Sequence, residues 1–182
     1  MLQLKSIFLF LSIVLLSTSN EVTISWRNNY KLSWEHFKGQ PQKNTDAVAV
    51  TASGITFSYS LKHRNSEVID FTTNVEAHFY PEKSWYIKER ANQYILAHEQ
   101  LHFDITELHV RKLRHQISQV KINNFLKRTL DRLHQNSNEE LAKMQKRYDT
   151  ESHNSINTEA QTKWQKFVAK ELEKYDAYKS AD

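Results

Sequence analysis

Two hydrophobic periods divide the chain. Between residues 20 and 80, apolar and polar residues alternate in short runs, as they do in half-buried β-strands. The clearest run is residues 55–61 (ITFSYSL), and shorter runs lie at 22–26, 48–51, 68–71 and 75–80. Both glycines and both prolines lie at or before residue 81, where they punctuate loops and turns. The first half is therefore predicted to form a small β-sheet.

From residue 84 onward the pattern is helical, and neither glycine nor proline occurs. Ser84 is the expected N-cap of a first long helix over about residues 85–116. At 100° per residue, one face of this helix holds Ala91, Ile95, His98, His102, Ile105, His109 and Leu113. Three histidines, His98, His102 and His109, thus replace apolar residues on the stripe that should face the core.

The rest of the helical half contains shorter predicted elements. In chain order they are a helix at 120–134, a loop at 135–138, a helix to about 147, a polar connector at 148–157 and a helix at 159–175. Ser137 and Thr158 are the expected N-caps of the last two helices, because each precedes a Glu or Gln by three residues. The expected fold is α+β, β-rich over 20–80 and helical over 84–178, with a small N-terminal sheet packed on the long helix.

The long helix carries His98-Glu99-Gln100-Leu101-His102, a His-Glu-x-x-His motif. Positions i and i+4 are neighbours on one helix face, so His98 and His102 are predicted to bind one zinc ion. Glu99 is the predicted catalytic base, which would take a proton from a zinc-bound water. The alternative is two core histidines that only form hydrogen bonds, but two histidines one turn apart with a glutamate between them favour the metal site.

A third zinc ligand must come from elsewhere in the chain. His109 lies on the same face but about 10 Å beyond His102 along the axis, too far for one ion. His153, in the polar connector, is the preferred third ligand. Glu151, an aspartate, a strand histidine such as His78, or no third protein ligand are the alternatives.

The first 19 residues resemble a secretory signal. Lys5 precedes an apolar run of ten residues (7–16), and small residues follow at 17–19. The protein is therefore expected to be exported, periplasmic or secreted, as a single domain over 20–182 without stable membrane insertion. An uncleaved anchor is the alternative.

The composition excludes several kinds of covalent site, metal ligand and partner. The chain has no cysteine, which excludes disulfides, a cysteine nucleophile, thiolate zinc ligands and a lipoprotein anchor. The formal net charge is +4, but basic and acidic residues are interspersed, so a nucleic-acid partner is not expected. The expected partner is a peptide or protein substrate.

Several motifs together resemble a bacterial domain of unknown function described as predicted secreted zinc-dependent proteases. They are residues 32–41 (LSWEHFKGQP), 47–55 (AVAVTASGI), 96–105 (LAHEQLHFDI) and 148–152 (YDTES), with Gln161 and Trp164 downstream. The resemblance implies a zincin-like metallopeptidase in which His98 and His102 bind zinc and Glu99 is catalytic. The family's last motif has its histidine six residues after the tyrosine, where this chain has Asn154 and places His153 one residue earlier.

The leading hypothesis is an exported zinc metallopeptidase. Its rival is a non-catalytic binding or cell-envelope module that keeps the fold with a degenerate or structural metal site. The substitution at Asn154 favours this rival.

Overall fold

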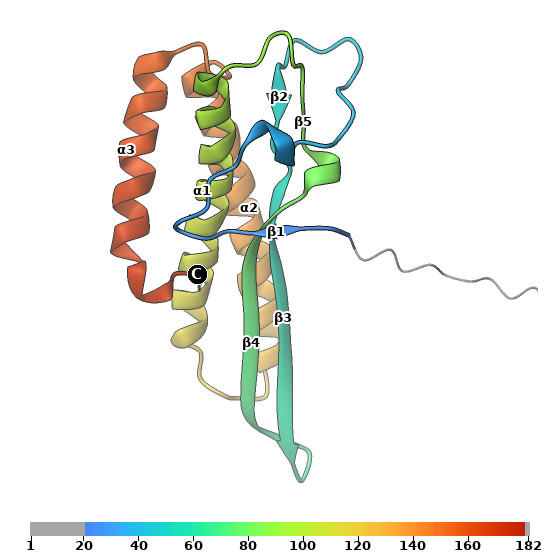
Figure 1. Ribbon diagram of the computed structural model, residues 1–182. Helices are drawn as coiled ribbons and strands as arrows, with labels where there is room; N and C mark the ends of the chain where they lie inside the picture. The colour runs from blue at the N-terminus through green and yellow to red at the C-terminus, as the bar shows by residue number, and fades with distance from the viewer. Residues whose placement is uncertain (1–20, 181–182) are drawn as a thin grey trace, which may run out of the picture.

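The computed structural model describes residues 21–180, so the expected signal at 1–19 lies outside the described residues. The described chain is α+β, with two small antiparallel sheets and three α-helices (Figure 1). The strands are β1 (Ile24–Ser25), β2 (Ala49–Val50), β3 (Ser53–Arg64), β4 (Glu67–Phe79) and β5 (Trp85–Tyr86). The helices are α1 (Gln93–Ser118), α2 (Leu126–Ser152) and α3 (Thr158–Lys174), with 3-10 turns η1 (Trp34–His36), η2 (Pro81–Lys83) and η3 (Asp176–Tyr178). Over residues 21–180, no helix is both long and apolar enough to span a bilayer.

A long hairpin forms most of the sheet. Strands β3 and β4 pair from Ser53–Phe79 at one end to Arg64–Glu67 at the other. Strand β1 pairs with the C-terminal end of β4, where Ile24 lies opposite Phe79. The apolar face of the hairpin packs on α1 and α2, with Val75, Ala77 and Phe79 buried (Figure 1). The period-two prediction for residues 55–61 is confirmed. The two runs predicted at 68–71 and 75–80 belong to one strand, because pairing with β3 continues across the polar residues between them.

Helix α1 is the centre of the molecule, with the hairpin and α2 on one side and α3 on the other (Figure 1). It begins at Gln93 rather than near residue 85, because the Asn92 side chain caps it by accepting from the backbone N–H of Ile95. Ser84 does not act as the cap. Its hydroxyl accepts from the backbone N–H of Ala52 at 2.9 Å and joins the loops on either side of the hairpin.

The residues just after Ser84 form β5, which pairs with β2 in the second sheet. This short sheet lies beside the N-terminal half of α1, above the end of the hairpin (Figure 1). Gly39 lets the N-terminal loop approach this region, since its N–H donates to the carbonyl oxygen of Ser84 at 2.8 Å. A Cβ at Gly39 would lie 2.8 Å from the carbonyl oxygen of Glu82.

Helix α2 is continuous where the sequence predicted a loop at 135–138. Ser137, the expected N-cap, is a buried mid-helix residue whose hydroxyl donates to the backbone carbonyl of His109 on α1. Packing against α1 therefore overrides the local helix-stop signals. The helix also continues through residues 148–152, which were predicted as connector, and α3 follows after a short turn, capped by Asn157 rather than Thr158.

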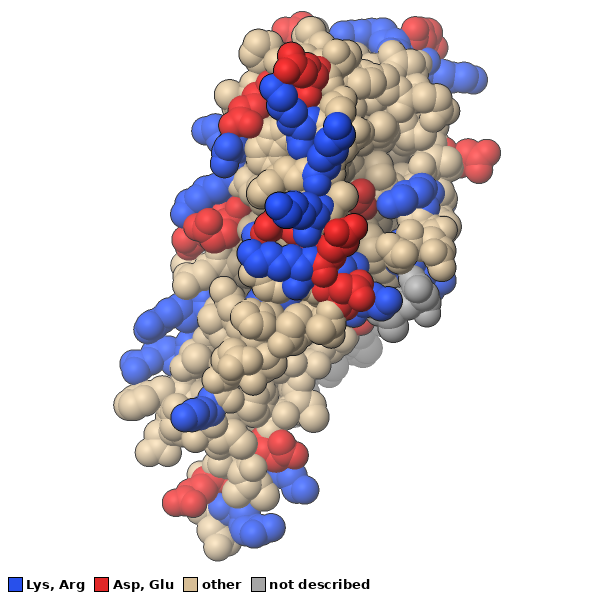
Figure 2. Space-filling view, turned by 90° about the vertical axis from the view of Figure 1, so that its left-hand side faces the viewer, with Lys and Arg blue, Asp and Glu red and all other residues tan. Residues whose placement is uncertain are grey.

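Charges on the face covered by α3 are mixed. Figure 2 shows basic and acidic side chains side by side over this face, without a field of one sign. Ion pairs at i, i+4 spacing join Lys163 to Glu159 on α3 and Arg147 to Glu151 on α2.

Candidate metal centre

The two motif histidines lie one turn apart on the buried face of α1. His98 is 4% exposed and His102 is 8% exposed, and their Nε2 atoms are 3.3 Å apart. Their rings meet edge to face with centroids 4.9 Å apart. The helix therefore brings both imidazoles to one point, as the i, i+4 spacing predicted.

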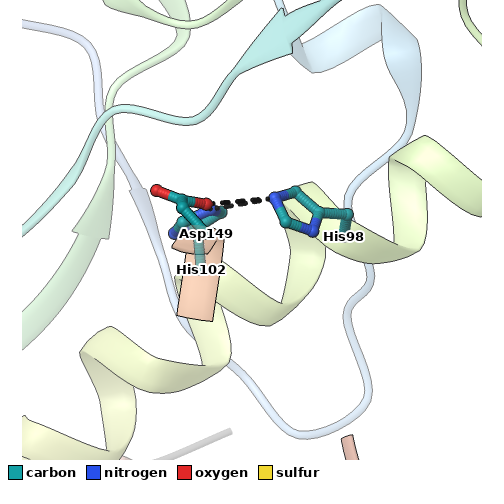
Figure 3. Close-up of side chains that lie close together, drawn as sticks. All are labelled: His98, His102 and Asp149. Carbon is teal, nitrogen blue, oxygen red and sulfur yellow. Dashed lines mark hydrogen bonds and ion pairs between the residues drawn. The ribbon is translucent and has the colours of Figure 1, made fainter. Parts of the chain in front are cut away.

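Asp149, near the end of α2, completes the group (Figure 3). Its Oδ1 atom lies 2.9 Å from Nε2 of His102 and 3.2 Å from Nε2 of His98. Among residues 21–180, these three form a cluster in which one ligand atom of each lies close enough to the others to share an ion. The cluster could bind a metal ion.

The spacing of the three atoms fits a small tetrahedral ion. Zinc ligands lie about 2.0–2.1 Å from the metal, which places neighbouring ligand atoms of a tetrahedron about 3.3 Å apart. The three distances, 2.9, 3.2 and 3.3 Å, are close to this value. Two imidazole nitrogens and one carboxylate oxygen also form a suitable donor set for zinc, with a fourth position left for water or substrate.

Packing holds the histidine rings in place. The ring of Tyr148 stacks on His98 with centroids 4.5 Å apart and meets His102 edge to face, while Trp164 from α3 packs behind it. Tyr148 is fully buried, and burial raises the pKa of its phenol, so it stays neutral. The Nδ1 atom of His98 is buried without a hydrogen-bond partner, so the polar contacts of this ring are made through Nε2.

Electrostatics keep Asp149 ionised. Burial by itself would raise the pKa of this carboxyl, but hydrogen bonds from His102 and His98 outweigh it and lower the pKa well below its usual range. Burial tends to lower the pKa of His102, yet the hydrogen bond to Asp149 and the nearby charge of Glu99 raise it overall. The anionic charge needed beside a cation is thus present at neutral pH.

Glu99 lies in the same cleft as the three clustered residues. The cleft has a volume of about 500 Å³ and is formed by the chain around β2, the first half of α1, and the end of α2 with the turn after it. Glu99 is 4% exposed, and its backbone carbonyl accepts from the hydroxyl of Thr51, just after β2. The predicted base therefore borders the cleft next to the candidate metal position.

The other proposed third ligands lie elsewhere. His153 is the exposed C-cap of α2, with a left-handed backbone (φ 47°, ψ 50°). It lines a shallow depression next to the cleft, and Asp149 borders both. Glu151 accepts hydrogen bonds from Arg147 and Trp164, and His78 bonds to other side chains of the sheet. Zinc binding by His153 stays a sequence-based prediction, whereas the structure groups Asp149 with the two histidines.

The sequence indicates only an unnamed aspartate among the alternative ligands, because it predicts residues 148–157 as a connector, whereas α2 continues to Ser152 and carries Asp149. A prediction that the helix continues to residue 152 would have pointed to Asp149 as a site residue. In such a helix, Asp149 lies four residues after Gln145 on the same face, and Gln145 also borders the cleft.

The remaining residues of the extended motif anchor the N-terminal segment. Gln100 accepts from the backbone N–H of Leu32 at 2.8 Å and donates to Asp104 at 2.8 Å. Asp104 in turn accepts from the indole N–H of Trp26 at 2.8 Å. These contacts hold the N-terminal segment where it crosses α1.

Residues 21–157 match a family described as bacterial protein of unknown function (DUF922). The match covers most of the chain, so the protein belongs to this family. The motifs had indicated a bacterial domain of unknown function, and this part of the prediction is confirmed. All of α3 lies beyond the matched segment. No curated protein and no solved structure gives a significant match to the chain.

Proposed function

We propose that this family member is an exported zinc-dependent metallopeptidase with a zincin-like site. The observation that carries the proposal is the meeting of His98, His102 and Asp149 at ligand spacing beside a buried glutamate in a cleft. Structural zinc sites have four protein ligands, whereas catalytic sites have three and keep one position open. A cluster of three ligands that faces a cleft fits the second kind.

Each residue has a role in this proposal. His98, His102 and Asp149 would hold the ion, which when bound lowers the pKa of a coordinated water and polarises the peptide carbonyl. Glu99 accepts the proton from the attacking water and delivers it to the departing amine. The Asp149 carboxylate adds one negative charge to the ligand set.

The position of β2 supports a peptide as substrate. One edge of β2 pairs with β5, and within residues 21–180 no strand pairs with its other edge. The residues of β2 line the cleft beside Glu99. An extended peptide could add to this edge through backbone hydrogen bonds, which would align it along the metal position.

The test compares Glu99→Gln with the wild-type protein. We expect zinc content, measured by plasma mass spectrometry, to remain near one ion per chain in both, while cleavage of a peptide library is lost in the variant. Glu140→Gln, which changes a carboxylate on the exposed face of α2, is the matched control and should cleave normally.

Unchanged cleavage by Glu99→Gln would refute the role of Glu99. Zinc retention without cleavage by the wild-type protein would favour the rival, a non-catalytic module with a structural metal.

A further inference from the structure

We propose that the cleft selects peptides with a bulky aliphatic or aromatic side chain next to the bond that is cut, and that Ile156 makes the main contact. This inference rests on the proposed function, since it names the substrate class of the same site. Apolar side chains line the cleft beside the candidate metal centre.

Ile156 stands at the mouth of the cleft with 80% of its surface exposed, the highest value among the large exposed hydrophobic residues of the described chain. Val50, on β2, lines the same cleft and is 37% exposed. The partly buried Ile95 and Val48 extend this apolar lining inward. An isoleucine so exposed gains little from folding, whereas a bulky apolar side chain placed against it would be removed from water.

The backbone before Ile156 has an unusual conformation. His153, Asn154 and Ser155 all have positive φ values, of 47°, 49° and 75°. Residues other than glycine seldom adopt this region, and three in succession are costly unless surrounding contacts impose them. Such strained segments concentrate at functional sites.

Specific hydrogen bonds impose this turn. The N–H of Asn154 donates to the backbone carbonyl of Asp149 at 2.9 Å, and the N–H of Asn157 donates to that of Ser152 at 2.8 Å. The backbone of Asp149, whose carboxylate faces the two histidines, therefore also fixes the turn that carries Ile156. Ile156 and the candidate metal centre therefore keep a fixed position relative to each other. Selection of the side chain next to the cut bond requires this.

The test measures binding without cleavage. Zinc-loaded Glu99→Gln protein is titrated with fluorescein-labelled peptides that are identical except for one central residue, which is Leu, Phe, Ser, Asp or Lys. We expect the Leu and Phe peptides to bind about tenfold more tightly than the Ser peptide, which is the low end of what an apolar pocket provides. Adding Ile156→Ser should reduce this preference to less than about threefold.

Phe125→Ser is the matched control, because Phe125 is another exposed apolar residue (60%) but lies at the opposite end of α2 from Asp149. It should keep the full preference. Equal binding of all the peptides, no binding, a preference for Asp or Lys, or a preference unchanged by Ile156→Ser would overturn the inference.

The two proposals fail in different ways. Selective binding by the variant together with no cleavage by the wild-type protein would refute the peptidase but keep the apolar contact. Cleavage without any apolar preference would refute only the contact.

Discussion

The third ligand of the proposed zinc site gives the sharpest prediction. Asp149→Asn keeps the size of the side chain but removes the anionic oxygen that lies 2.9 and 3.2 Å from the two Nε2 atoms. Loss of a residue that only orients a ligand typically weakens metal binding about 10–100-fold. Loss of a direct ligand should exceed this, so we expect zinc to bind at least about 100-fold more weakly, or ~2.8 kcal/mol.

The assay is a competition titration of metal-free protein against a zinc-binding dye at pH 7.5, with circular dichroism to verify folding. Asp131→Asn is the matched control, because Asp131 lies on the same helix but is exposed and pairs with Lys127 and Tyr59. His153→Asn tests the other candidate, since asparagine tolerates the left-handed backbone at this position. We expect both to bind zinc within about twofold of the wild-type protein, because neither changes a clustered ligand atom.

Wild-type affinity in Asp149→Asn together with weak binding in His153→Asn would refute this reasoning. It would mean that the turn after α2 rearranges to bring His153 to the metal.

Three further predictions concern the scaffold and are tested by urea unfolding. Glu107→Ala should destabilise the protein by about 3–5 kcal/mol, because it removes the buried carboxylate 2.8 Å from the guanidinium of Arg111 and leaves only the exposed Asp176, at 3.7 Å, as its acidic partner; a loss below about 1 kcal/mol would contradict a buried pair. Gly39→Ala should cost about 1–3 kcal/mol, since its Cβ would lie 2.8 and 2.9 Å from two carbonyl oxygens, whereas Gly54→Ala, whose Cβ meets nothing nearer than 3.5 Å, should be nearly neutral. An equal loss of unfolding free energy for the two alanine substitutions would contradict this steric explanation. Burial lowers the pKa of His109 to about 4 from an ordinary 6.5, so the unfolded chain takes up this proton first and stability falls as the pH drops from 6.5 to 4. The loss between pH 7 and pH 4 should be about 3 kcal/mol larger in the wild-type protein than in His109→Leu, and equal losses would exclude His109 as the cause.

The sequence by itself determined the elements whose signals are local. Period-two alternation predicted the strand at residues 55–61, and helical periodicity without glycine or proline predicted the helical half. The i, i+4 spacing placed His98 and His102 together, because that contact depends only on helix geometry.

The tertiary structure decided where α2 ends and which residue joins the histidines. Polar residues at 135–138 and a capping box at Ser137 are local signals for a break, but packing of Ser137 against α1 outweighs them. The helix then continues to Ser152 and carries Asp149 to His102, a residue 47 positions earlier. Periodicity says which face of each helix is buried. It does not say which residues of two buried faces meet, because that depends on how the helices pack.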